Sequence, residues 1–258
     1  MRADRRQFIK VAGLALLGLG VKQATELVSG SNLVEASSQP AAPARRWAMA
    51  IDLSRCVRAE GCTDCIVACH RVHNVPRFHD PKEEIKWIWK ASYESAFAED
   101  AHPFTAAGLA GKQVPLLCNH CDNPACVRVC PTQATWKRED GIVMMDMHRC
   151  IGCRYCMVAC PYGARSFNFR DPREGLDMEA LPSTFPTRTR GVVEKCNFCA
   201  ERLAKGQTPA CVEACNEKAM LFGDLLDPRS AIREALNTRH SIRRNPGAGT
   251  NPQIYYLV

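Results

Sequence analysis

Sixteen cysteines fall in four groups of four, and none is left over. Each group brings several thiols within a few residues of one another, which suits a metal centre with thiolate ligands. The third group has the spacing of the bacterial 4Fe–4S run, including its final proline. Sixteen thiolates suffice for four such clusters, and a chain with four clusters is expected to move electrons. The groups are Cys56-x5-Cys62-x2-Cys65-x3-Cys69, Cys118-x2-Cys121-x4-Cys126-x3-Cys130, Cys150-x2-Cys153-x2-Cys156-x3-Cys160 and Cys196-x2-Cys199-x11-Cys211-x3-Cys215.

Three other cysteine chemistries fit these groups less well. Disulfide frameworks suit exported proteins, but they are typical of short domains, and this chain has 258 residues. Zinc ribbons use paired Cys-x2-Cys motifs and leave the third and fourth cysteine of each group unexplained. Covalent haem needs Cys-x2-Cys-His, whereas Cys121 is followed by Asp122, and Cys69-His70 follows Cys65 at the wrong spacing.

The fourth cysteine of a group has a separate role in the bacterial pattern. Three cysteines in one loop bind three irons of one cluster, and the fourth serves the other cluster of a pair. We expect this fourth cysteine to lie at the start of a short helix. Pro131 and Pro161 would fit there, because proline is tolerated in a first helical turn.

The N-terminus carries the features of an export signal. Arg5-Arg6 precedes a short apolar run, residues 11–21, which is too short to span a bilayer reliably. We assign residues 1–36 to a twin-arginine signal peptide, with an ordinary basic start or an uncleaved anchor as alternatives. The twin-arginine route carries folded proteins, which suits cluster-binding thiols bound for an oxidising compartment. We therefore expect a location in the periplasm or on the outer face of the cytoplasmic membrane.

The remaining segments predict an α+β fold built from a repeated unit. Trp47–Asp52 has the pattern of a strand, and Asp140-Gly141 between two short apolar runs predicts a hairpin. We expect a duplicated bacterial-ferredoxin-like fold, two nested two-cluster units with short hairpins and long loop insertions. The boundaries are a linker at 37–46, a four-cluster domain at 47–226 (inner unit 114–170, outer unit 47–70 plus 190–224, insertion 70–114) and a C-terminal extension at 227–258.

The formal charge of +7 is no sign of nucleic-acid binding. Sixteen thiolates and four oxidised clusters of +2 each would bring the loaded protein to about −1. Basic residues are better explained as compensation for cluster charge, with a solvated surface as the alternative for each. The candidates are Arg154, Arg165, Lys195 and Arg202.

The insertion at 70–114 holds two tryptophans, Trp87 and Trp89. Tryptophan is enriched where partner proteins bind, so this pair is a candidate contact surface. Packing against a small core is the alternative. No run of 18 apolar residues follows Leu226, so no membrane-spanning tail is expected.

Three segments carry a family resemblance: Cys118–Cys126, Cys150–Arg165 and Pro209–Cys215. From about Trp47 to Asp224 the chain resembles the four-cluster ferredoxin subunits of membrane respiratory oxidoreductases. Within that group, the chain most resembles the DsrO-type subunit of the sulfite-reductase-associated Dsr membrane complex. The features that carry this resemblance are the twin-arginine signal, the absence of a tail anchor and the segment 85–90.

The resemblance implies a non-catalytic electron-transfer subunit with four 4Fe-4S clusters. Its expected partner is an integral membrane quinone-reactive subunit of the NrfD/DsrP kind, and the Dsr resemblance adds a haem c subunit. No nucleic acid and no small-molecule substrate of its own are expected. The alternative is the beta subunit of a molybdopterin reductase (polysulfide, tetrathionate or DMSO type) or of a formate-linked nitrite reductase. Cluster potentials and the direction of electron flow are left open.

The resemblance also implies how the ligands cross between groups. Two departures from the family pattern are the long spacing from Cys56 to Cys62 and Asn216 in place of proline after Cys215. The implied sets are Cys56, Cys62, Cys65 with Cys215; Cys196, Cys199, Cys211 with Cys69; Cys118, Cys121, Cys126 with Cys160; and Cys150, Cys153, Cys156 with Cys130.

Three further residues, His120, Met157 and Tyr162, lie beside these ligands in the sequence. They could tune a cluster through hydrogen bonds or packing near its sulfurs, and plain packing is the favoured interpretation. No constellation of a base and a nucleophile is evident in the sequence.

Overall fold

The computed structural model describes residues 44–100, 102 and 108–258. Residues 44–258 form one compact unit. The signal expected at 1–36 and most of the linker at 37–46 lie outside the described residues. Within those residues, no helix is both long enough and apolar enough to cross a membrane.

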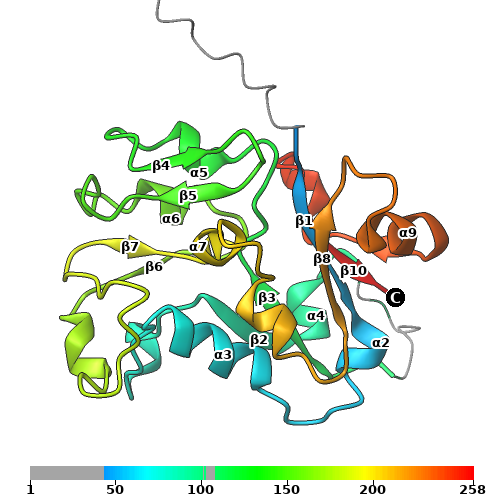
Figure 1. The fold of residues 1–258 in the computed structure, drawn as a ribbon, viewed down its shortest axis with the longest axis horizontal. Helices are drawn as coiled ribbons and strands as arrows, with labels where there is room; N and C mark the ends of the chain where they lie inside the picture. The colour runs from blue at the N-terminus through cyan, green and yellow to red at the C-terminus, as the bar shows by residue number, and fades with distance from the viewer. Residues whose placement is uncertain (1–43, 101, 103–107) are drawn as a thin grey trace, which may run out of the picture. The chain divides into compact units, whose positions relative to one another are not determined.

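The largest sheet is built around the first strand, β1 (Trp47–Asp52), as its sequence predicts. β1 pairs antiparallel with β8 (Met220–Asp224) and parallel with β10 (Ile254–Leu257), and β9 (Ser241–Ile242) adds to the far side of β10. Figure 1 shows β1, β8 and β10 beside helix α9 (Ala231–Thr238). The segment at 227–258 therefore contributes two strands and a covering helix to this sheet.

Both faces of β1 are buried. Ala48 and Ala50 pack with Ile232 of α9 on one face, while Met49 and Ile51 belong to the main core on the other. This explains a strand in which side chains on both faces are apolar, since each face meets a different layer.

The other strands form three short two-stranded ladders, which confirms the α+β fold with short hairpins. β2 (Ile88–Ser92) pairs with β3 (Gln113–Leu117), β4 (Thr135–Lys137) with β5 (Val143–Met145), and β6 (Ser166–Phe167) with β7 (Val193–Glu194), all antiparallel. The predicted turn between β4 and β5 is present. Gly141 ends it with a φ of +86°, a conformation that glycine adopts most easily.

The helices are short, and three of them correct the position expected for the fourth cysteine. α5 (Ala125–Arg128), α6 (Tyr155–Val158) and α8 (Ala210–Glu213) end just before that cysteine instead of starting at it. The chain then turns, with backbone bonds such as Lys218 N–H to the Cys215 carbonyl at 3.0 Å. Pro131 and Pro161 occupy the second position of such turns, where the fixed φ of proline is favoured.

The remaining helical segments connect the sheets or precede cysteine loops. Only one of them, α3, exceeds four residues. They are α2 (Leu53–Cys56), α3 (Asp64–Val72), α4 (Tyr93–Ala96), α7 (Ala200–Leu203) and the 3₁₀ turns at Pro81–Glu83, Pro172–Gly175 and Pro246–Ala248.

The two tryptophans of the insertion at 70–114 pack into the core, so the contact surface expected at Trp87 is wrong. Trp87 is 1% exposed, its indole N–H donates to Glu194 at 2.9 Å, and its ring stacks on His73. Trp89 is partly buried against the same core. A tryptophan with its ring packed and its N–H bonded has no surface left for a partner.

Candidate metal centres

Four helices carry the third cysteine of every group, and the fourth cysteine lies within the same helix or two residues after its end. α3 holds Cys65 and Cys69; α5, α6 and α8 hold the third cysteine and lead directly into the fourth. A spacing of four residues puts two side chains about one helical turn apart. Each helix can therefore offer thiols to two neighbouring centres. α3 packs against α8 and α5 against α6, so the helices form two pairs.

The first set of thiols, Cys56, Cys62, Cys65 and Cys215, lines one pocket together with Lys90. The ammonium of Lys90 donates to the Cys62 carbonyl. Burial and the neighbouring thiols raise the pKa of Cys65 to about 12. Four thiols held this close resist ionisation on their own, and a bound metal is what makes such groups thiolates.

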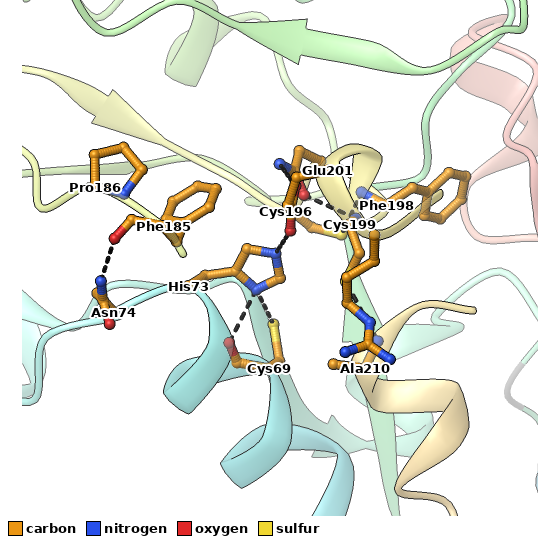
Figure 2. Close-up of polar contacts among 12 residues, drawn as sticks. Cys69, His73, Asn74, Phe185, Pro186, Cys196, Phe198, Cys199, Glu201 and Ala210 are labelled. Atoms are coloured by element: carbon orange, nitrogen blue, oxygen red, sulfur yellow. Dashed lines mark hydrogen bonds and ion pairs between the residues drawn. The ribbon is translucent and has the colours of Figure 1, made fainter. Parts of the chain in front are cut away.

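The second set gathers Cys69 with the last group. Burial raises the pKa of Cys69 well above its usual value, and Cys196, Cys211 and Cys199 contribute the next largest increases. Figure 2 shows Cys69 on its helix facing the loop that carries Cys196 and Cys199. Cys69, Cys196, Cys199 and Cys211 are all buried.

The third and fourth sets belong to the inner unit. Burial raises the pKa of Cys121 to about 12, and Cys118, Cys126 and Cys160 add to it electrostatically. A separate pocket is lined by the remaining thiols, of which Cys153 is the one exposed cysteine among the sixteen. That last set is Cys130, Cys150, Cys153 and Cys156.

Electrostatic coupling between thiols links the four sets in order, the first to the second, the second to the third and the third to the fourth. Cys65 of the first set acts on Cys69 and Cys211 of the second. Cys118 of the third set is the strongest thiol neighbour of Cys196 in the second. Cys126 of the third set in turn raises the pKa of Cys156 in the fourth, where burial is the larger cause. No such coupling joins the first set to the fourth in these pKa shifts.

Buried cations lie beside these sets. Of the four basic residues predicted to compensate cluster charge, Arg165 and Lys195 are buried beside cysteines. Arg165 is 5% exposed and donates from Nη2 to the Cys126 sulfur at 3.0 Å and to Thr135 at 2.8 Å. Lys195 is buried and donates to the Cys196 carbonyl at 2.6 Å. Arg154 is exposed over the ring of Phe167, and Arg202 pairs with Glu213 at the surface.

A histidine that sequence reasoning missed adds a third cation. The Nδ1 of His73 lies 2.9 Å from the Cys69 carbonyl and 3.7 Å from the Cys69 sulfur, and its Nε2 lies 2.8 Å from Glu201 (Figure 2). Burial lowers its pKa, but hydrogen bonds with Cys199 and Glu201 outweigh that effect and raise the pKa to about 9. Both ring nitrogens face acceptors, so the ring is held as a cation.

The backbone of His73 is fixed by a buried ion pair. Arg188 donates to the His73 carbonyl and to Glu194, and both charged side chains are fully buried. Glu194 also accepts from Trp87 and from Asn168. The only signal in the sequence was a histidine four residues after Cys69, on the same face of the helix.

The three residues beside the ligands differ in their environments. Tyr162 is buried, and its hydroxyl is 2.5 Å from that of Thr250. Met157 is partly buried with no polar contact of its own side chain among those described. His120 is fully buried, and its ring stacks on Phe198 with centroids 3.7 Å apart.

Comparison with known proteins adds relatives of matching length. The model of the 4Fe-4S dicluster domain matches residues 110–174 and 177–225. The chain is 41% identical to the Hdr-like menaquinol oxidoreductase iron-sulfur subunit 1 of Archaeoglobus fulgidus, over 98% of this chain and 97% of that protein. It is 38% identical to the iron-sulfur cluster-binding subunit of menaquinone reductase from Nitratidesulfovibrio vulgaris, over 82% and 88%.

A third relative belongs to a different kind of complex. It is a tetrathionate reductase subunit from Salmonella typhimurium, 34% identical over 100% of this chain and 89% of that protein. The names of these three proteins state different reactions, and each name describes a subunit of an oxidoreductase.

Proposed function

Because the chain belongs to the family of 4Fe-4S electron-transfer subunits of membrane respiratory complexes, we propose that it is a four-cluster wire between two redox partners. Each of the four thiol sets binds one 4Fe-4S cluster, with the fourth cysteine of each group crossing to a neighbouring set. The chain supplies no substrate site and transfers one electron at a time from cluster to cluster.

The observation that carries this proposal is the linear order of the four sets. Each adjacent pair of sets is coupled electrostatically, through the effects of Cys65, Cys118 and Cys126 on the pKa of a thiol in the next set. A structural role would need neither four centres nor this order. The cations Lys90, His73, Lys195 and Arg165 beside them offset the negative charge that thiolate-bound clusters carry.

The fourth set supplies the surface at which we place a partner. Its loops, 128–133 and 147–161, carry exposed apolar side chains around Cys153, with Val158 88% exposed, Ile151 67% and Tyr155 62%. The same loops contain exposed arginines and no acidic residue. A partner with an apolar centre and an acidic rim fits this surface, because buried aromatic and aliphatic anchors stabilise such contacts.

We infer that this partner is an integral membrane quinone-reactive subunit of the NrfD/DsrP kind. Electrons leave or enter the chain at an end cluster. That cluster must therefore lie a short distance from the redox group of the partner. Relatives named for menaquinol or menaquinone chemistry support the quinone link. The Dsr-linked complex, with a haem c subunit as a further partner, is the more specific proposal, and it rests on the twin-arginine signal and the segment 85–90.

The experiment that tests the docking surface changes Val158 to aspartate. We expect the Val158→Asp protein to keep all four clusters and to be reduced by dithionite. Loss of a central contact of about 2 kcal/mol corresponds to roughly 30-fold weaker association with the partner. Two assays measure this loss: sedimentation of the protein with partner-containing membranes, and reduction of its clusters by quinol.

Leu226→Asp is the matched control, because Leu226 is also exposed, at 53%, and follows β8 of the large sheet. It should bind membranes as the unchanged chain does. If both variants bind equally well, the docking surface lies elsewhere. If the purified chain alone converted a substrate, the proposal that it only transfers electrons would be wrong.

We propose that the protein acts in the periplasm after export by the twin-arginine route, on the evidence of Arg5-Arg6 and the apolar run that follows. Replacing both arginines with lysine should leave the protein in the cytoplasm with its clusters intact. Fractionation followed by immunodetection measures this. Unchanged export would mean that the arginines are an ordinary basic start.

A second candidate function rests on the full-length match to the tetrathionate reductase protein of Salmonella. As the beta subunit of a molybdopterin reductase, the same wire would deliver electrons from quinol to a molybdenum subunit. Purification of the native complex separates the two. Molybdenum in stoichiometric amount supports this second function, and haem c without molybdenum supports the Dsr-linked one.

A further inference from the structure

His120 presents a buried hydrogen-bond donor that the protein does not satisfy. Its Nδ1 accepts the backbone N–H of Val143 at 3.1 Å. That nitrogen is therefore unprotonated, and the proton of the neutral ring is on Nε2. Nε2 is fully buried and has no partner among the described residues. An unsatisfied buried donor destabilises the folded state, so an acceptor is expected beside it.

The acceptor does not come from the basic side chains around this ring. Lys195 and Arg165 lie near enough to lower the pKa of His120, after the larger effect of burial. Both are donors that already bond elsewhere, Lys195 to the Cys196 carbonyl and Arg165 to the Cys126 sulfur. Neither has a lone pair to offer. Asn119, next to His120, is also buried with both of its polar side-chain atoms unpartnered.

The position of His120 is the boundary between the second and third thiol sets. His120 precedes Cys121 in one Cys-x2-Cys loop, and Phe198 precedes Cys199 in another. Both residues have positive φ angles, +41° and +55°, and their rings stack face to face with an interplanar angle of 16°. The two loops thus meet through equivalent residues, of which only the histidine carries an N–H on its ring.

We propose that the Nε2–H of His120 donates a hydrogen bond to a sulfur of a cluster at this boundary. The inference rests on the proposal that the second and third sets each bind a 4Fe-4S cluster. The proton would stay on Nε2 of His120 in both oxidation states of a bound cluster, so electron transfer would break no bond at this residue. The bond strengthens as the sulfur becomes more negative, so it stabilises the reduced cluster and raises its midpoint potential. His120 is a tuning residue at the junction of the two ferredoxin units.

The test compares three variants by redox titration monitored with electron paramagnetic resonance. His120→Phe keeps a ring on Phe198 and removes the donor, and it should shift the potential of one cluster to a more negative value. His120→Gln restores an N–H donor and should recover most of the shift. Phe198→Leu disturbs the same stack without touching the donor and should leave that potential unchanged.

Iron content is measured first in every sample, because it separates two failures. Fewer than four clusters in the unchanged chain would contradict the proposed function, whatever His120 does. With four clusters present, an unshifted His120→Phe protein overturns the hydrogen bond, and so does an equal shift in Phe198→Leu. If the His120→Phe protein fails to bind its clusters, the His120→Met protein is used instead. This variant also removes the donor, and the same two outcomes decide the test. Loss of an exchangeable-deuteron coupling to the reduced cluster in the donor-free variant is the supporting signature.

Discussion

Single side chains set the electrostatic environment of each thiol set. A fully buried charge is costly unless it is paired and hydrogen-bonded, yet Arg165, Lys195 and His73 are all buried beside cysteines. Each donates to a sulfur or to the carbonyl of a cysteine. These cations are therefore best understood as counter-charges for the centres that the cysteines hold.

Arg165 gives the most direct prediction at this scale. Changing Arg165 to glutamine removes the charged donor at the Cys126 sulfur, so the cluster bound there should become harder to reduce. Hydrogen bonds to charged groups contribute about 1.5–3 kcal/mol, or roughly 60–130 mV for one electron. Potentiometric titration measures the shift. Arg170→Gln, which alters an exposed arginine paired with glutamates, is the control. Equal potentials in all three proteins would show that Arg165 is structural.

Short elements place the thiols, and their geometry depends on a few close approaches. The helices that carry Cys65 and Cys69, or Cys126 followed by Cys130, link neighbouring sets within one turn. The loop of the fourth set packs against the chain just before β7. A side chain at Gly152 would meet the Gly191 carbonyl at 2.4 Å, and the φ of Gly152 is +71°.

Gly152→Ala should therefore destabilise the fourth centre. The clash and the backbone strain together cost about 2–4 kcal/mol. Gly163 is a matched control, because its φ is +61° and nothing lies near its missing Cβ, so Gly163→Ala carries the strain of about 1 kcal/mol alone. With about 2–4 °C per kcal/mol for a chain of this size, thermal unfolding distinguishes the two. Equal melting temperatures of the two variants would show that the loop around Gly152 accommodates the added methyl group without loss of stability.

At the scale of the whole molecule, the cysteines are part of the core. Cys65, Cys69, Cys118, Cys196 and Cys211 belong to the same buried cluster as Trp87 and Tyr256. Apolar burial alone does not hold the cysteine loops together, because the four thiols of each set face one another and would be joined only by a bound cluster. Cluster binding should therefore supply a large part of the folding free energy.

Two measurements on the whole chain check this. Anaerobically prepared protein should hold about 16 irons, four for each of four clusters. Removing the iron with a chelator under reducing conditions should unfold the chain cooperatively, as followed by near-ultraviolet circular dichroism. A value near 8 irons with zinc present would contradict the four clusters. An iron-free chain with unchanged melting temperature would contradict their structural role.

Local patterns were enough for much of this protein. The cysteine spacing predicted metal-binding loops, Trp47–Asp52 predicted a strand, and Asp140-Gly141 predicted a hairpin, all of which depend on residues close together in the chain. These features are determined by the sequence because short-range geometry and hydrogen bonding decide them.

Tertiary structure alone decided the rest, because it concerns groups that meet only after folding. Trp87 is a core residue since Glu194 and His73 pack on it from distant segments. Three of the fourth cysteines follow their helices, and the turns after them lead into strands β4, β6 and β8 of three different sheets. The pairing of His73 with Glu201 and the stacking of His120 on Phe198 join loops more than 70 residues apart. No periodicity records such contacts, since burial and partner choice are set by the whole fold.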